Sequence, residues 1–203
     1  MAATLLGQAN HHTTQIQHVL PICGIFLIFD FKPNQNRMTI KFEHSIEEGI
    51  HARLNKIAGN WEGMARTWFQ PDVIADESPV SGTIRPVLGG RFLLHEYEGS
   101  FAGKPLQGIV IYGYDLNTGS FQSAWIDSFH MGTGIMFSQQ AKPEGNFSVY
   151  GSYQAMMPEG QQEWGWRTDL ELEDENTLVV TAYNITPEGT ETKATEIIYK
   201  RKA

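Results

Sequence analysis

From Gly59 onward the chain is a series of short runs rich in β-branched and aromatic residues, each followed by a turn signal. Many connections place Gly or Asn where a hairpin needs a positive φ, as in Leu88-Gly89-Gly90 and Asn117-Thr118-Gly119. About ten strands at this spacing predict a sandwich or a barrel. Because nearly every connection is short enough to join adjacent antiparallel strands, we expect an all-β, up-and-down barrel rather than a Greek key. The predicted strands are Trp61–Phe69, Ser81–Val87, Phe92–Ser100, Gly108–Asp115, Ser120–Asp127, Ile135–Ser138, Phe147–Tyr153, Glu163–Glu171, Leu178–Ile185 and Glu191–Lys200.

One short helix is predicted ahead of the strands. Its apolar positions are spaced by three or four residues, which is typical of a helical stripe. The stripe consists of Phe42, Ile46, Ile50, Leu54 and Ile57. Ser45 with Glu48 fits a capping box, and Gly59 follows as a helix stop. His44 and His51 fall mostly off the stripe, so we expect both to be solvated.

Residues 1–37 differ from the rest. Their apolar run, Val19–Phe31, is shorter than the ~20 residues needed to span a bilayer. No positive charge precedes the run and no small-residue cleavage site follows it, so it is a poor signal peptide. We expect residues 1–37 to be an extension, disordered or arising from a start assigned too early, and residues 38–203 to be a single, cytoplasmic β-barrel domain. The alternative is a genuine extension that covers part of the barrel.

The charge and the cysteine count exclude several classes of protein. A net charge of −8 argues against a protein that binds the nucleic-acid backbone, which needs a basic surface. Cys23 is the single cysteine, so neither an intramolecular disulfide nor a Cys-pair zinc site can form. We expect no nucleic-acid or membrane partner, and a homodimer is left open.

Two short motifs resemble those of the calycin superfamily of lipocalin-like barrels. Gly59-Asn60-Trp61 opens the first strand, and Ile198-Tyr199-Lys200-Arg201 ends the last. The resemblance implies that Trp61 closes one end of the barrel and that an arginine packs on its indole, as a cation–π contact allows. Arg201 is the first candidate for that partner and Arg167 the second.

Longer segments resemble a bacterial family known as domain of unknown function 1579. They are Leu88-Gly89-Gly90-Arg91-Phe92-Leu93, Tyr97-Glu98-Gly99, Gly113-Tyr114-Asp115 and Trp125-Ile126-Asp127-Ser128. The resemblance extends over roughly residues 42–201. It implies a lipocalin-like barrel, supplies no catalytic residues, and does not ordinarily include residues 1–37.

Alternation along the strands separates inward from outward side chains. Glu96 and Glu98 mark the outer face of one strand, so His95 and Tyr97 should point inward. The strand Gly108–Asp115 is apolar on both faces, and alternation alone leaves its direction open.

Adjacency in the sheet nevertheless predicts that Tyr112 points inward beside His95 and Trp125, unless a one-residue bulge reverses the faces. The predicted ligand-binding residues are His95, Tyr97, Tyr112, Trp125, Asp127, Trp164 and Trp166. The alternative is that these aromatic residues simply fill the barrel as core.

An aromatic interior with a few polar groups is typical of a small-molecule site. We therefore expect a protein that binds an apolar or amphipathic small molecule, rather than an enzyme. The alternative is an enzyme that uses the same pocket with His95 or His130 as acid–base group. A histidine within hydrogen-bond reach of Asp, Ser or Tyr inside the pocket would favour catalysis. A third interpretation, an assembly module, is favoured if the interior is filled and the outer face of Gly108–Asp115 is an exposed apolar patch.

Metal and cofactor chemistry find little support. A catalytic zinc needs three protein ligands, and His95, His130 and Asp127 lack ligand spacing. Related barrels called nitrobindins bind haem through a histidine on a late strand, but no histidine follows His130. No G-x-S-x-G elbow accompanies Ser123 or Ser128. We expect no metal and no cofactor.

Overall fold

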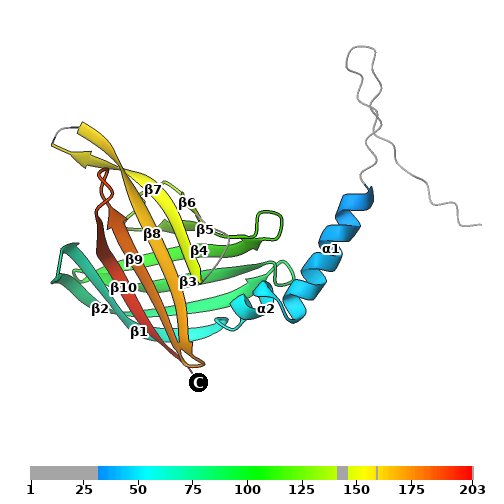
Figure 1. Ribbon diagram of the computed structural model, residues 1–203. Coiled ribbons are helices and arrows are strands. Elements are labelled where there is room, and N and C mark those ends of the chain that lie inside the picture. The colour runs from blue at the N-terminus through cyan, green and yellow to red at the C-terminus, as the bar shows by residue number, and fades with distance from the viewer. Residues whose placement is uncertain (1–31, 141–145, 159, 203) are drawn as a thin grey trace, which may run out of the picture.

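The computed structural model describes residues 32–140, 146–158 and 160–202 (Figure 1). Most of the predicted extension, residues 1–31, lies outside the described residues. Among the described residues, no helix is both long enough and apolar enough to cross a membrane.

Ten antiparallel strands form one closed barrel in which spatial order follows chain order (Figure 1). The last strand pairs with the first, Trp61 lying opposite Arg201, and this pairing closes the sheet. The predicted up-and-down barrel is therefore confirmed. The strands are β1 (Gly59–Gln70), β2 (Val73–Val87), β3 (Phe92–Phe101), β4 (Lys104–Asp115), β5 (Ser120–Asp127), β6 (Met136–Gln139), β7 (Phe147–Met157), β8 (Gly160–Asp174), β9 (Thr177–Ile185) and β10 (Glu191–Arg201).

Several strands extend beyond the predicted bounds. β2 begins at Val73 rather than Ser81, and its first residues pair with the end of β1. Val73 and Ile74, which are neighbours in the chain, are 57% and 50% exposed. This segment therefore lacks the alternation of buried and exposed residues that marks a half-buried strand. Pairing with a neighbouring strand, rather than burial, accounts for the extra length.

The helix predicted over residues 42–57 is present but is divided into two helices. The structure has α1 (Lys32–Glu47) and α2 (Ile50–Asn55), separated at Gly49, and α1 projects away from the barrel (Figure 1). Ser45 therefore lies inside α1 and does not cap it. The predicted domain boundary at Met38 also falls within this helix.

The break between the helices corrects the expectation for His51. Its side chain is buried rather than solvated, and its Nδ1 lies 2.8 Å from Ser45 Oγ. The ring also packs edge-on against Phe42 at 5.2 Å. A change of direction at Gly49 turns His51 back toward α1, which a continuous helix would not do. His44 is exposed, as predicted.

Trp61 and Arg201 lie at the barrel end nearest α2, here called the helix end. The Trp61 indole is fully buried and its Nε1 donates to the Ile57 carbonyl at 3.0 Å. The Arg201 guanidinium lies 4.2 Å from the centre of that ring. It also donates to the carbonyls of Ala58 and Lys56 at 2.6 and 2.8 Å. These bonds tie the last strand to the turn that follows α2.

Arg167 has a different setting from Arg201. Its guanidinium bonds to Glu191 and packs over the Tyr183 ring at 3.9 Å. Of the two candidates, Arg201 is therefore the arginine that contacts Trp61.

The barrel interior holds two groups of buried side chains. The larger one fills the helix end, where Trp61, Leu178 and Tyr199 have no exposed surface. The smaller one lies at the opposite end, here called the far end. It consists of Met136, Trp166, Ala182 and Ala194, with Trp125, Met131 and Tyr153 partly buried against it.

Candidate functional site

Three adjacent strands direct His95, Tyr112 and Trp125 into the barrel. His95 and Tyr112 are each 2% exposed, and Trp125 is partly buried against both interior groups. The register pairs Tyr112 with Leu93 and Ser123, which fixes the face that alternation left open on β4. The predicted inward directions are therefore confirmed, and Ile109 and Ile111 face outward.

His95 lies deep in the barrel between two tyrosine hydroxyls. Its Nδ1 is 3.3 Å from Tyr112 Oη, and its Nε2 is 3.3 Å from Tyr199 Oη. Burial lowers the pKa of His95 to about 4, so the imidazole is neutral at neutral pH. One nitrogen then donates and the other accepts, and both are used within the protein. A Cβ at Gly82 would lie 2.8 Å from His95 Nε2, so the glycine makes room for this ring.

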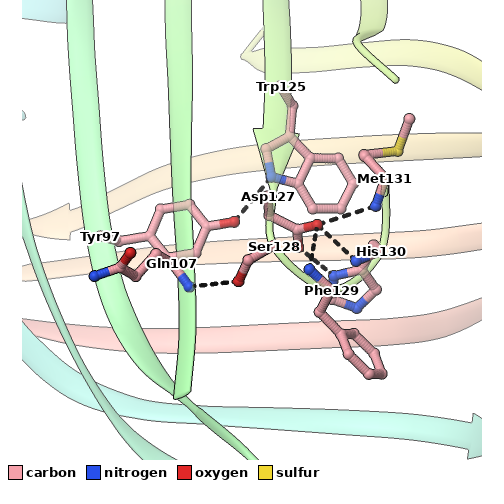
Figure 2. A network of polar contacts seen from close by, with 8 residues as sticks. All are labelled: Tyr97, Gln107, Trp125, Asp127, Ser128, Phe129, His130 and Met131. Atoms are coloured by element: carbon pink, nitrogen blue, oxygen red, sulfur yellow. Dashed lines mark hydrogen bonds and ion pairs between the residues drawn. The ribbon is translucent and has the colours of Figure 1, made fainter. Parts of the chain in front are cut away.

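Tyr97 is held in place between two glycines and an indole. Gly82 and Gly108 are its register partners on either side. A Cβ at Gly108 would lie 2.2 Å from the Tyr97 hydroxyl, so a side chain there would displace the ring. The hydroxyl accepts a hydrogen bond from Trp125 Nε1 at 2.8 Å, and burial raises the pKa of Tyr97 (Figure 2). This hydrogen bond connects Tyr97, which lies deep in the barrel near His95, with Trp125, which packs against the side chains of the far end.

The far end carries a stacked pair of indoles. The rings of Trp125 and Trp166 lie 5.4 Å apart and within 22° of parallel. Tyr153 meets Trp166 edge-on at 6.2 Å and donates from its hydroxyl to Asn184 Oδ1 at 2.8 Å. Trp125, His130, Tyr153 and Trp166 together are called the far-end cluster below.

Trp164 shares the inner face of β8 with Trp166, two residues away. Its Nε1 is buried and has no hydrogen-bond partner among the described residues. A buried donor without an acceptor costs about 1–3 kcal/mol. Trp164 therefore offers an unused hydrogen bond near the stacked indoles.

Asp127 organises the loop that follows β5. Its Oδ1 accepts the backbone N–H groups of Phe129, His130 and Met131, at 3.2, 2.6 and 3.0 Å. Its Oδ2 lies 2.5 Å from His130 Nδ1 (Figure 2). Burial opposes ionisation, but the hydrogen bonds that Asp127 accepts from the His130 side chain and from the backbone N–H groups of Met131 and His130 outweigh it, and the pKa of Asp127 lies below its usual value. The carboxylate is thus buried, ionised and fully bonded.

The hydrogen bonds of Asp127 hold His130 beside the stacked indoles of Trp125 and Trp166. Its ring centre is 5.4 Å from that of Trp125 and 6.3 Å from that of Trp166. Its Nε2 has no hydrogen-bond partner in the described part of the chain. The side chain is 26% exposed, whereas that of Asp127 is not exposed at all.

Both histidines thus lie within hydrogen-bond reach of a polar partner, the condition that favours catalysis. His95 meets it inside a packed core, where both nitrogens are occupied. His130 meets it next to the far-end cluster, with one nitrogen unoccupied. Of these two histidines, His130 is the one with a ring nitrogen that no described residue bonds. Within residues 38–140, 146–158 and 160–202, no three His, Cys, Asp or Glu side chains gather to hold a metal ion.

Sequence reasoning missed three contributors to the interior. Tyr199 bonds His95, Asn184 bonds Tyr153, and Met131 packs on the far-end group. Asn184 lies in an apolar strand with no motif around it, and nothing in the sequence marks it. The aromatic alternation that identified Trp166 applies equally to Tyr153 and Tyr199, and it is the one available signal.

A separate groove of about 1070 Å³ opens on the outer wall of β2 to β5 rather than inside the barrel. Its wall is mixed, with Ser81, Thr83, Glu96 and Gln107 beside Ile109 and Ile126. On the outer face of β4, Ile109 and Ile111 are 38% and 43% exposed. One condition of the assembly interpretation is therefore met, while the interior is filled at the helix end.

The geometry defines the class of protein first: a closed, up-and-down antiparallel β-barrel with an aromatic interior. Residues 47–201 match the family described as protein of unknown function (DUF1579), and the chain belongs to that family. No curated protein matches the sequence.

Solved structures also resemble the chain, and three of them illustrate the likeness. Protein Rv2717c from M. tuberculosis is 12% identical, with 75% of this chain and 96% of that chain covered and a TM-score of 0.48. The S-type phycobiliprotein lyase CPES from Guillardia theta is 10% identical, with coverage of 75% and 92% and a TM-score of 0.43. A de novo designed fluorescence-activating β-barrel is 12% identical, with coverage of 73% and 95% and a TM-score of 0.37.

Proposed function

We propose that the protein binds a small, largely apolar molecule at the far end of the barrel, against Trp125 and Trp166. The observation that carries the proposal is the contrast between the two ends. The helix end is filled by side chains with no exposed surface, whereas Trp125, Tyr153 and Trp164 at the far end are only partly buried. Partly buried aromatic rings with few polar groups are typical of small-molecule sites.

The polar groups at the far end suit a ligand with one or two hydrogen-bonding atoms. Trp164 Nε1 is a buried donor without an acceptor. A ligand acceptor would complete that bond and recover the cost of leaving it unmade. The rest of the surface offered to the ligand is aromatic, and an exposed ring face packs well against another flat group.

The predicted site residues divide into two roles in this proposal. Trp125, Trp164 and Trp166 would contact the ligand, and Asp127 would act through His130. His95, Tyr97 and Tyr112 would hold the walls, because their polar atoms already bond to other side chains. Trp61 and Arg201 would close the helix end. A cytoplasmic location and a homodimer both remain predictions.

The proposal can be tested with the neutral fluorescent probe N-phenyl-1-naphthylamine, titrated into the full chain. Trp166→Leu removes one of the stacked indoles and should weaken binding at least tenfold. Ile109→Ser, in the outer-wall groove, and Trp68→Leu, under Lys193, are matched controls and should leave affinity unchanged. Loss of binding in Ile109→Ser with retention in Trp166→Leu would place the probe in the outer groove and overturn the proposal.

A second candidate function, catalysis on a small substrate with His130 as general base, is favoured by the Asp127–His130 pair alone. A carboxylate that fixes the orientation of an imidazole is a common arrangement for acid–base chemistry. Mass spectrometry of a molecule that copurifies with the protein separates the two functions. A binding protein returns the molecule unchanged after prolonged incubation, whereas an enzyme converts it.

A further inference from the structure

We infer that the ligand of the far-end site is a planar aromatic molecule bearing a hydroxyl group, which donates a hydrogen bond to Nε2 of His130. The inference rests on the proposed function and specifies the chemical class of its ligand. The group that carries it is the side-chain pair of Asp127 and His130.

The pair fixes the tautomer of His130. The Asp127 carboxylate can only accept hydrogen bonds, and it lies 2.5 Å from His130 Nδ1. The proton of the neutral imidazole must therefore reside on Nδ1. Nε2 then carries a lone pair, which makes it an acceptor rather than a donor.

The position of that acceptor is also fixed before any ligand arrives. Three consecutive backbone N–H groups bond to Asp127 Oδ1, so the loop that bears His130 is anchored to the end of β5. The imidazole rests against Trp125 at 5.4 Å and Phe129 at 4.8 Å. A preorganised group loses little conformational entropy when it binds, which favours affinity.

Nε2 is a ring-nitrogen acceptor of the far-end cluster that no described residue bonds. The Tyr153 hydroxyl donates to Asn184, and Trp166 Nε1 donates to Thr168 Oγ1 at 3.1 Å. The neighbouring Tyr97 hydroxyl accepts from Trp125. A ligand that places a donor at Nε2 thus meets a partner that no described side chain already uses.

Charge favours a neutral hydroxyl over an anionic group at this position. Asp127 is ionised within the same pair, and the chain as a whole carries a net charge of −8. A carboxylate on the ligand would face both the Nε2 lone pair and the nearby Asp127 charge. The nearly parallel indoles of Trp125 and Trp166 favour a flat aromatic body for the rest of the molecule.

Three probes of similar size isolate the hydroxyl: naphthalene, 2-naphthol and 2-methoxynaphthalene. The first has no polar atom, the second has a donor, and the third has an acceptor only. Binding is followed by quenching of tryptophan fluorescence in the full chain. We expect 2-naphthol to bind about fivefold or more tightly than the other two, as one net hydrogen bond provides.

Asp127→Asn tests the tautomer directly. The introduced amide keeps an oxygen for the three backbone N–H groups but presents an N–H to His130 Nδ1. The imidazole proton must then move to Nε2, which becomes a donor. The advantage of 2-naphthol over 2-methoxynaphthalene should disappear, and 2-methoxynaphthalene should gain on naphthalene. Ser128→Ala, next to the pair, is the matched control and should keep the wild-type order of affinities.

Nitrogen NMR of the wild-type histidines provides a readout that needs no variant. The unprotonated Nε2 of His130 should shift when 2-naphthol is added and remain unchanged with naphthalene.

The outcomes separate the two claims. If none of the probes binds, or if they bind without dependence on Trp166, the proposed function fails. If all three bind equally, or if the Nε2 resonance does not respond to 2-naphthol, the hydroxyl inference fails while the proposed function stands.

Discussion

Acid should destabilise this protein through His95 in a range where most buried carboxylates are still ionised. Burial lowers the pKa of His95 to about 4 in the folded protein, against 6.5 for an ordinary histidine. Between these values the unfolded chain binds a proton that the folded protein does not. The free energy of unfolding therefore falls as the pH falls, starting near pH 6.5.

The size of the effect follows from the two pKa values. Between pH 7 and pH 5, proton uptake by the unfolded chain should lower the free energy of unfolding by about 2 kcal/mol. For a chain of this length, that corresponds to a decrease of roughly 4–8 °C in melting temperature. Asp127 adds little in this range, because its pKa lies below an ordinary value of 3.8.

His95→Gln is the matched variant for this experiment. A glutamine offers one donor and one acceptor to Tyr112 and Tyr199, as the neutral imidazole does, but it does not titrate. Urea unfolding at pH 7, 6 and 5 should show wild type losing about 2 kcal/mol more than the variant. His51, whose pKa burial also lowers, contributes equally to both proteins. Equal losses in the two proteins would refute the assignment of this sensitivity to His95.

Four further predictions concern the rest of the barrel. Trp61→Ala should cost about 3–5 kcal/mol in urea unfolding, since the indole is completely buried; a variant of normal stability would show that Trp61 does not close the helix end. Gly108→Ala should destabilise by about 1–3 kcal/mol and alter the tryptophan emission spectrum, because its Cβ would push the Tyr97 hydroxyl off Trp125; an unchanged spectrum counts against that contact. A chain that begins at Met38 should melt within about 5 °C of the full chain, and a larger drop would show that earlier residues stabilise the fold. Elemental analysis should find no stoichiometric zinc or iron, and one metal ion per chain would contradict the expectation of no metal site.

The sequence is informative about the barrel because its evidence is local. Turn residues and alternation mark each strand, and their short connections imply the order of the sheet. Where both faces of a strand are apolar, as around Tyr112, only pairing with β3 and β5 fixes the direction. The helix prediction misses the break at Gly49 because it, too, uses only local evidence. The apolar stripe continues through the glycine, but the chain turns there to bring His51 against Ser45 and Phe42.

The interior contacts depend on residues far apart in the chain. Tyr199 lies 104 positions from His95, and no sequence pattern around either residue predicts the hydrogen bond between them. Asp127 and His130 are only three positions apart, yet their pairing depends on the conformation of the loop between them. Alternation can place a side chain inside a barrel, but it does not say which polar atoms meet.

The two interior histidines show how the partner, rather than the residue, sets the role. His95 lies between hydroxyls, which can donate or accept, so it adapts to its neighbours and both of its nitrogens are used. His130 faces a carboxylate, which only accepts, so its proton is fixed on Nδ1 and no described residue bonds Nε2. Asp127→Asn should therefore turn Nε2 of His130 from an acceptor into a donor while the imidazole ring stays in place. No single substitution of Tyr112 or Tyr199 would have the same effect on His95, because the remaining hydroxyl can either donate or accept.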